Sequence, residues 1–308
     1  MGLSRALVAA QESGLLDALA YGERRTAERW AAAQGTAPRA TEVLLEVLVA
    51  CGIADRTDAG FAGSTALRAT FEEGVGGAAL MLWTRIGEFL RTGQALAEMD
   101  GDAGTRARAY AGVVTSLGVQ FERAAARFAE AIPGAQGEVL DVGCGSGVWG
   151  LAVAQRWGRT RVTGLDWAEV LPAFERRAAQ LGLAERIGLQ PGDMHTVDLS
   201  VQYDLIVVAN VLRLESPARA RALLERLALA LARGGRLVIV DALAHGSPDR
   251  ELARSLYGLH LALRTREGRV HTPGAVREWL EAAGLTVGSP LDFGVHVGAV
   301  AALVGCRG

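Results

Sequence analysis

The chain has 308 residues, of which 50% are hydrophobic, and a formal net charge of −2. That length accommodates two domains with a sizeable core, and the near-neutral charge gives no electrostatic reason to expect a nucleic-acid or anionic-membrane partner. The three cysteines lack the paired spacing of a disulfide framework or a zinc site, and no apolar stretch is long enough to span a membrane. We expect a soluble cytoplasmic protein without a bound metal.

The N-terminal region predicts three helices followed by a hairpin. Apolar residues recur at helical spacing over residues 3–20, with a break at Gly14, and Thr26 is placed to cap a further helix that ends at Gly35. A third helix covers residues 37–51, and a turn at residues 58–60 joins two short strands. This order is that of a winged helix, a unit that often binds DNA.

The charges of the third helix argue against DNA binding. A helix that reads DNA presents several arginine, lysine, asparagine or glutamine side chains on its open face. Here the helix offers only Arg39 near its start and places Glu42 and Glu46 further along. Because these carboxylates repel phosphate, we expect no nucleic-acid partner.

The pattern stays helical between residues 74 and 132, with a break at residues 100–104 and a single helix expected over residues 106–132. We therefore place the domain boundary at this break. The prediction is an N-terminal all-α domain at residues 1–103 and a second domain at residues 104–308.

A glycine-rich turn follows the first strand of the second domain. Residues 138–142 predict a buried strand, and Gly143, Gly145 and Gly147 then turn the chain directly into a helix. Such a turn exposes unpaired N–H groups at a helix N-terminus, which suits a nucleotide-like ligand. Residues 161–165 predict the next strand, and Asp166 at its end, followed by Trp167, is placed to accept bonds from ribose hydroxyls.

The charge of Asp141 discriminates between nucleoside cofactors. This residue lies in the first strand just before the glycine turn, where it would repel the pyrophosphate of a dinucleotide. S-adenosylmethionine carries no phosphate and brings a sulfonium and an ammonium, both of which a carboxylate attracts. The sequence therefore favours S-adenosylmethionine over a dinucleotide.

Strands and helices then alternate, which predicts an open, mostly parallel sheet. Further strands are expected at residues 187–190, 203–209 and 236–241, with an antiparallel pair at the C-terminus. Ligands of such sheets lie outside the carboxyl ends of the strands. The residues expected at that edge are Gly143, Asp166, Asp193, Asn210 and Asp241.

The glycine motif, Val139 to Gly147, resembles the first motif of class I S-adenosylmethionine-dependent methyltransferases. The N-terminal run LLDALAYGERRTAERWAAAQGTAPRATEVLLEVLVACGIADR is similar to that of small-molecule O-methyltransferases with a winged-helix-like dimerisation domain. The resemblance implies a Rossmann-like α/β fold with seven strands, a homodimer, a small-molecule substrate and S-adenosylmethionine as cofactor. It assigns Asp193 and Met194 to the adenine and makes Asn210 a further cofactor-binding candidate. It also implies that the helices of residues 74–132 form a lid over the substrate pocket. The pocket candidates on these helices, although such residues more often belong to the core, are Met81, Trp83, Arg85, Phe89, Tyr110 and Phe121.

The catalytic histidine of that family is missing. Residues 210–215 read Asn-Val-Leu-Arg-Leu-Glu where the family has Asn-Val-Leu-His-Asp-Trp, and Val270 replaces the glutamate that braces the histidine. Arginine is not a general base, but Arg213 can hold an anionic nucleophile by charge-assisted bonds. This favours methylation at carbon or at an already acidic oxygen, unless Arg213 merely pairs with Glu215 or Glu225.

Other candidates for a catalytic base are His260, Tyr257 and His271. Two other functions stay open. One is an enzyme of the same fold that uses S-adenosylmethionine without methyl transfer, for decarboxylation, hydroxylation or rearrangement. The other is a winged-helix regulator that senses the cofactor.

Overall fold

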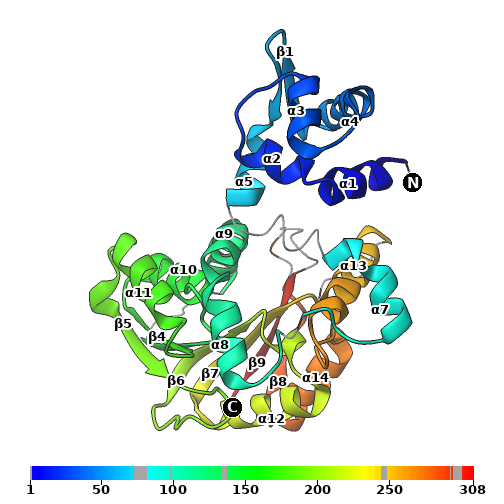
Figure 1. Cartoon of the computed structure of the whole chain (residues 1–308). Coiled ribbons are helices and arrows are strands. Elements are labelled where there is room, and N and C mark those ends of the chain that lie inside the picture. Colours follow the sequence, from blue (N-terminus) through cyan, green and yellow to red (C-terminus); the bar gives the residue numbers. More distant parts are fainter. Residues whose placement is uncertain are drawn as a thin grey trace. The chain divides into compact units, whose positions relative to one another are not determined.

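The computed structural model describes residues 2–72, 82–97, 99–132, 137–243, 248–291, 293 and 300–308. The chain divides into two compact units, Met1–Gly93 and Gln94–Gly308 (Figure 1). The sequence placed the boundary ten residues later, at 103/104. Residues after Gly93 belong with the second unit because the N–H of Leu96 donates to the Leu263 carbonyl at 2.7 Å. The carboxylate of Asp100 likewise accepts from the backbone of Arg266 and Glu267.

The first unit is helical with one hairpin. The strands β1 (Ala54–Thr57) and β2 (Gly60–Gly63) pair antiparallel, which confirms the predicted hairpin. The break predicted at Gly14 is confirmed, because this residue has a φ of 73° and separates two helices. Its helices are α1 (Gly2–Glu12), α2 (Leu15–Tyr21), α3 (Ala27–Gln34), α4 (Pro38–Ala50), α5 (Thr65–Glu72) and α7 (Ile86–Thr92).

The second unit is built on a seven-stranded, mostly parallel sheet, as predicted. Its strand order is β5-β4-β3-β6-β7-β9-β8, and only β9 runs antiparallel to its two neighbours. The strands are β3 (Gly137–Val142), β4 (Thr160–Asp166), β5 (Ile187–Pro191), β6 (Tyr203–Ala209), β7 (Leu231–Asp241), β8 (Thr286–Val287) and β9 (Ala301–Cys306).

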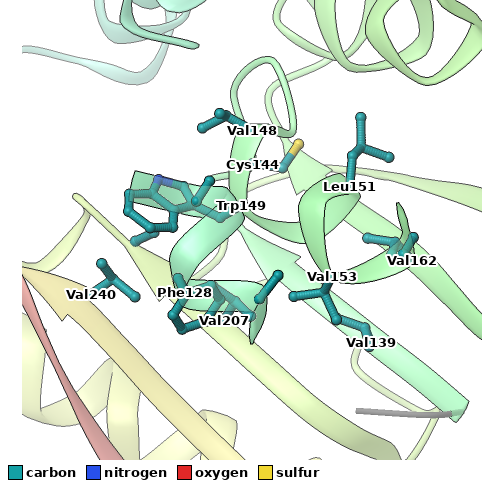
Figure 2. Close-up of a cluster of buried hydrophobic side chains, with 14 of the residues drawn as sticks. Phe128, Val139, Cys144, Val148, Trp149, Leu151, Val153, Val162, Val207 and Val240 are labelled. Carbon is teal, nitrogen blue, oxygen red and sulfur yellow. The ribbon is translucent and has the colours of Figure 1, made fainter. Parts of the chain in front are cut away.

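Helices cover both faces of this sheet, because successive strand residues point to opposite sides. Val139 and Val207 pack with α9 (Val114–Ala131), α10 (Val148–Arg156) and α11 (Leu171–Gln180). Figure 2 shows the centre of this cluster, where Phe128 and Trp149 lie near the sheet valines. Leu140 and Val208 face the other way, toward α12 (Pro217–Leu229) and α14 (Pro273–Ala282).

Two further helices, α8 (Ala103–Ala111) and α13 (Pro248–Arg264), complete the second unit. The sequence predicted one helix for residues 106–132, but the structure breaks it between α8 and α9. Phe121, a candidate pocket residue, is instead part of the core: it is 7% exposed and its ring lies 5.9 Å from that of Trp149.

Of the other pocket candidates, Met81 lies outside the described residues. Trp83, Arg85 and Phe89 belong to the first unit. There Arg85 forms an exposed ion pair with Glu88 at 2.9 Å. Only Tyr110 belongs to the second unit and has a buried polar atom there.

Candidate active site

The glycine turn has the backbone conformation that the sequence predicted. Gly143, Gly145 and Gly147 have φ angles of 63°, 55° and 76°, a region that other residues rarely adopt. The N–H of Gly143 donates to the Leu165 carbonyl at 2.8 Å, which ties the turn to β4. A side chain at Gly147 would also lie 2.4 Å from the Phe174 ring. Both backbone conformation and space therefore require glycine at this turn.

Asp166 joins the end of β4 to this turn. Its Oδ2 accepts from the N–H of Gly145 at 2.8 Å, and its Oδ1 accepts from the N–H of Trp167, also at 2.8 Å. Burial raises the pKa of Asp166, while these two hydrogen bonds lower it. Each carboxylate oxygen keeps a second lone pair, so the side chain can still accept from the hydroxyls of a ligand.

Asp141 has a structural role that was not predicted from its charge. Its carboxyl group is 2% exposed, and Oδ2 accepts from the N–H of Gly150 at 2.9 Å in the first turn of α10. Burial raises the pKa of Asp141 to about 8, against the hydrogen bond from Gly150. The visible function of Asp141 is to cap α10 and hold it on the sheet. Its geometry gives no support to a direct attraction for the cations of a cofactor.

Asn210 follows β6 in a strained conformation. It is the one non-glycine residue with positive φ, 61°, in the described part of the chain. Its N–H donates to the Val240 carbonyl at 2.8 Å, and its buried Oδ1 has no hydrogen-bond partner among the described residues. A buried acceptor of this kind at the carboxyl edge of the sheet is suited to a donor on a ligand.

The turn after β5 lies at the same edge but is engaged locally. Asp193 Oδ1 accepts from the N–H of His195 at 2.9 Å, and Met194 packs against the core cluster that contains α12 and α14. Their assignment to adenine stays a prediction from the family resemblance.

Arg213 is buried where the family has its histidine. It lies in the short 3₁₀ helix Leu212–Leu214 and is 7% exposed. Its Nη1 is 3.6 Å from Asp241 Oδ1, and its guanidinium carbon is 4.7 Å from the centroid of the Tyr257 ring. Its Nε has no hydrogen-bond partner among the described residues. The cation is therefore only partly compensated.

The idea that Arg213 pairs with Glu215 or Glu225 is wrong. Glu215, whose side chain is 1% exposed, instead accepts from Arg106 at 2.7 Å and from Arg219 at 2.5 Å, and lies 3.3 Å from His195. Burial raises the pKa of Glu215, but the bonds from His195, Arg106 and Arg219 outweigh it and lower the value to about 2.

Glu225, in turn, pairs with Arg221 on the exposed face of α12. No sequence pattern predicted the bond between Arg106 and Glu215, because 109 residues separate these partners.

The three remaining base candidates fall into two groups. Tyr257 and His260 are both on α13, and the centroids of their two rings are 6.3 Å apart. The Tyr257 ring also contacts Arg213. Burial and the charges of Arg264 and Arg213 lower the pKa of His260 to about 4, which makes it a weak proton acceptor. His271 is different, because its Nε2 lies 2.9 Å from the Leu212 carbonyl oxygen and 3.2 Å from that of Glu215. His271 therefore anchors the segment that carries Arg213.

The described residues contain no group of three or more histidine, cysteine, aspartate or glutamate side chains that could hold a metal. None of the helices in the described ranges combines the length and the apolar character needed to cross a membrane.

Comparison with known proteins agrees with this geometry. The model of a family described as an O-methyltransferase domain matches residues 100–286, which contain every candidate site residue named above from Arg106 to His271. A solved structure, the O-methyltransferase NcsB1 from neocarzinostatin biosynthesis in complex with S-adenosylmethionine and 2-hydroxy-5-methyl naphthoic acid, superposes with a TM-score of 0.72. It is 23% identical and covers 100% of this chain and 96% of that chain, a similarity that shows the fold.

Three curated relatives are more similar in sequence. The L-tyrosine C(3)-methyltransferase of Streptomyces lavendulae is 30% identical over 46% of this chain and 37% of that protein. The aclacinomycin 10-hydroxylase RdmB of Streptomyces purpurascens is 32% identical over 51% of this chain and 44% of the hydroxylase. The tetracenomycin polyketide synthesis 8-O-methyl transferase TcmO of Streptomyces glaucescens is 27% identical over 92% of this chain and 88% of TcmO. The matches thus span less than half of the first two relatives and most of the third.

Proposed function

We propose that this chain, which belongs to the O-methyltransferase domain family, transfers a methyl group from S-adenosylmethionine to a small, natural-product-like molecule. The observation that carries the proposal is the bond between Asp166 and the N–H of Gly145. It holds a carboxylate with free lone pairs beside a glycine turn, inside the region matched by the family model. The names of two relatives, a tyrosine methyltransferase and TcmO, support the same chemistry.

The residues at the carboxyl edge fit this cofactor. Asp166 can accept from ribose hydroxyls, the glycine turn leaves backbone accessible, and the buried Oδ1 of Asn210 lacks a partner among the described residues. By the family resemblance, Asp193 and Met194 would meet the adenine. When bound, S-adenosylmethionine supplies an electrophilic methyl group.

The chain's own residues favour an acceptor that is already anionic or carbon-centred. Among the described residues, neither Arg213 nor His260 is suited to replace the missing histidine, because an arginine is not a general base and burial with the charges of Arg264 and Arg213 lowers the pKa of His260 to about 4. Asp241 and Tyr257 hold the Arg213 guanidinium in place, so it can stabilise a phenolate or enolate without moving. Carbon methylation is also the activity in the name of the tyrosine relative.

Transfer of labelled methyl groups tests the proposal. The purified protein is incubated with methyl-labelled S-adenosylmethionine and a metabolite extract, and the small-molecule fraction is separated and counted. We expect a labelled product with the wild type and none with Asp166→Ala. A bound cofactor that is never consumed, with no labelled product, would contradict methyl transfer.

Two observations favour a second function. Arg213 replaces the family's base, and a relative 32% identical over half of this chain is named a hydroxylase. On this alternative the cofactor stays bound while the substrate is hydroxylated, decarboxylated or rearranged. Mass spectrometry separates the two functions, because only methyl transfer adds a labelled methyl group to the product and releases S-adenosylhomocysteine.

The first unit supports a dimer. We assign the winged-helix-like arrangement of α3, α4 and the hairpin to dimerisation, in line with the family resemblance. The packed helices α1 and α4 carry Leu3 and Val43, which are 49% and 59% exposed. Burying such side chains against a second copy is favourable.

A further inference from the structure

A second guanidinium lies beside the ring that Arg213 contacts. Arg264, at the end of α13, has its guanidinium carbon 5.9 Å from the centroid of the Tyr257 ring, and its Nη2 donates to the Tyr257 hydroxyl at 2.9 Å. Arg213 approaches the same ring at 4.7 Å. Two like charges are thus held against one aromatic side chain, which is unfavourable unless something negative compensates them.

Three buried donors at this place have no hydrogen-bond partner in the described ranges. They are the Nε of Arg213, the Nε of Arg264 and the hydroxyl of Tyr110. A buried donor left unpaired is costly, so native proteins seldom keep one except where a ligand or water completes it. Three of them in one neighbourhood indicate a site for an acceptor.

The charges around these donors leave an excess of positive charge. Arg106 is matched by Glu215, and Arg213 has only the distant contact with Asp241. Arg264 has a neutral phenol as its partner in the Tyr257 bond. These charges affect neighbouring groups. Burial and the charges of Arg264 and Arg213 lower the pKa of His260. Burial raises the pKa of Tyr110, and the same two charges act against that rise.

The surroundings of the donors are aromatic. Tyr110 and Trp167 border a small apolar cluster with Val114 and Val170. The Tyr257 ring is near both guanidinium groups, and its centroid is 6.3 Å from that of His260. Flat side chains of this kind pack well on a flat ligand. A guanidinium is also the group best matched to a planar, conjugated oxyanion.

We propose that Arg213, Arg264 and the Tyr110 hydroxyl together bind the oxyanion of an aromatic acid, which is the methyl acceptor of this enzyme. The proposal rests on the function proposed above and names its substrate class. The oxyanion is either a carboxylate or an ionised phenol on the ring, since both offer the same acceptor atoms. Arg213 occupies the position of the family's catalytic histidine, and Arg264 extends the site along α13.

Three small probes separate the two sources of the oxyanion. Salicylate, 2-methoxybenzoate and methyl salicylate are titrated by calorimetry at neutral pH into protein saturated with S-adenosylhomocysteine. If a carboxylate is held, salicylate and 2-methoxybenzoate bind at least about tenfold more tightly than the ester. If a phenolate is held, 2-methoxybenzoate fails, and the ester gains affinity as the pH is raised through its phenol pKa. Equal binding of all three probes, or no binding of any at neutral pH and at a pH above the phenol pKa of the ester, overturns the proposal.

Variants show whether the named residues are responsible. Arg264→Met should weaken the tighter probe by about tenfold or more, Arg264→Lys should weaken it less, and Tyr110→Phe should weaken it without disturbing the fold. Arg221→Met, which removes an exposed arginine of α12, is the matched control and should change nothing. Unchanged probe binding in Arg264→Met and Tyr110→Phe would overturn the assignment.

The cofactor titration keeps this test separate from the proposed function. If S-adenosylhomocysteine does not bind the wild type, the proposed function fails. If it binds equally to the wild type and Arg264→Met while acids and ester bind alike, only the substrate class is wrong.

Discussion

The guanidinium carbon of Arg213 lies 4.7 Å from the centre of the Tyr257 ring, at the position where a catalytic histidine is expected. Asp241 at 3.6 Å and the ring together fix a cation that is 7% exposed. A fixed, poorly solvated cation stabilises negative charge without reorganising during the reaction. We therefore propose that Arg213 acts as an electrostatic group and not as a base.

Arg213→Met should reduce turnover of the acceptor found in the labelling experiment by about a hundredfold or more, the scale seen when one aimed electrostatic donor is removed. Arg213→Lys keeps the charge and should retain part of the activity. Arg213→His restores the family's residue but supplies a base instead of a fixed cation, so it should not rescue turnover. Initial rates with labelled cofactor measure all three.

Histidine variants provide the comparison. His260→Ala should keep most of the activity, because its pKa of about 4 makes it a poor proton acceptor. The Arg213 account is wrong if Arg213→Met turns over normally while His260→Ala or His271→Ala is inactive.

Glu215→Gln should lower stability most at neutral pH. Its carboxylate is buried between Arg106 and Arg219, and the folded-state pKa of about 2 lies below the ordinary value of 4.5. A lowered pKa gives stability that is present above pH 4.5 and is lost as the pH falls toward 2. Removing the charge leaves Arg106 uncompensated, at a cost of about 3 kcal/mol or more. Urea unfolding at pH 7 and pH 3.5 measures this difference.

Glu225→Gln is the matched control for that experiment. Like Glu215, Glu225 pairs with an arginine, Arg221. The side chains of Arg221 and Glu225 are, however, 57% and 45% exposed. We expect a change within about 0.5 kcal/mol at either pH. Equal effects of the two substitutions would show that the Glu215 network has no special stabilising role.

Gly150→Ala tests the packing of α10 on the sheet. An added Cβ would lie 2.6 Å from Asp141 Oδ2 and 2.9 Å from Val162 Cγ1. The helix must move off β3 and β4, and overpacking of this kind costs roughly 1 to 3 kcal/mol. Gly158→Ala, where nothing lies within 4 Å, should be almost neutral. Thermal unfolding of both variants checks the contrast, and equal melting temperatures would contradict it.

The proposed dimer predicts a particle of about twice the chain mass in light scattering. Replacing the exposed Leu3 and Val43 by glutamate should dissociate it, because a charge would be buried in an apolar interface. Glutamate at Leu229, exposed on α12 of the second unit, should leave the mass unchanged. A monomeric wild type, or salt-sensitive DNA binding, would instead favour the regulator alternative.

Much of the fold follows from local sequence patterns. Alternating strands and helices predicted the parallel sheet, and the glycines at 143, 145 and 147 predicted the turn because few other residues adopt positive φ. The break at Gly14 was predicted, but the break between α8 and α9 was missed, since apolar spacing continues across it.

The polar partners of the site could not be predicted in the same way. Arg106 meets Glu215 across 109 residues, and Arg213 selects Asp241 on a neighbouring strand end instead of the glutamates close to it in sequence. Arg264 was missed because one arginine at a helix end has no distinguishing pattern. Such pairings depend on how distant elements pack, which the periodicity of one segment does not encode.

The most direct test is a calorimetric titration of S-adenosylhomocysteine into the wild type and Asp166→Ala, with Asp198→Ala as an exposed control. Asp166 accepts from Gly145 and remains able to bind a ribose. We expect micromolar affinity for the wild type and Asp198→Ala, and a loss of about 1.5 to 3 kcal/mol for Asp166→Ala. Tight binding of NAD with no response to S-adenosylhomocysteine or S-adenosylmethionine would contradict the account.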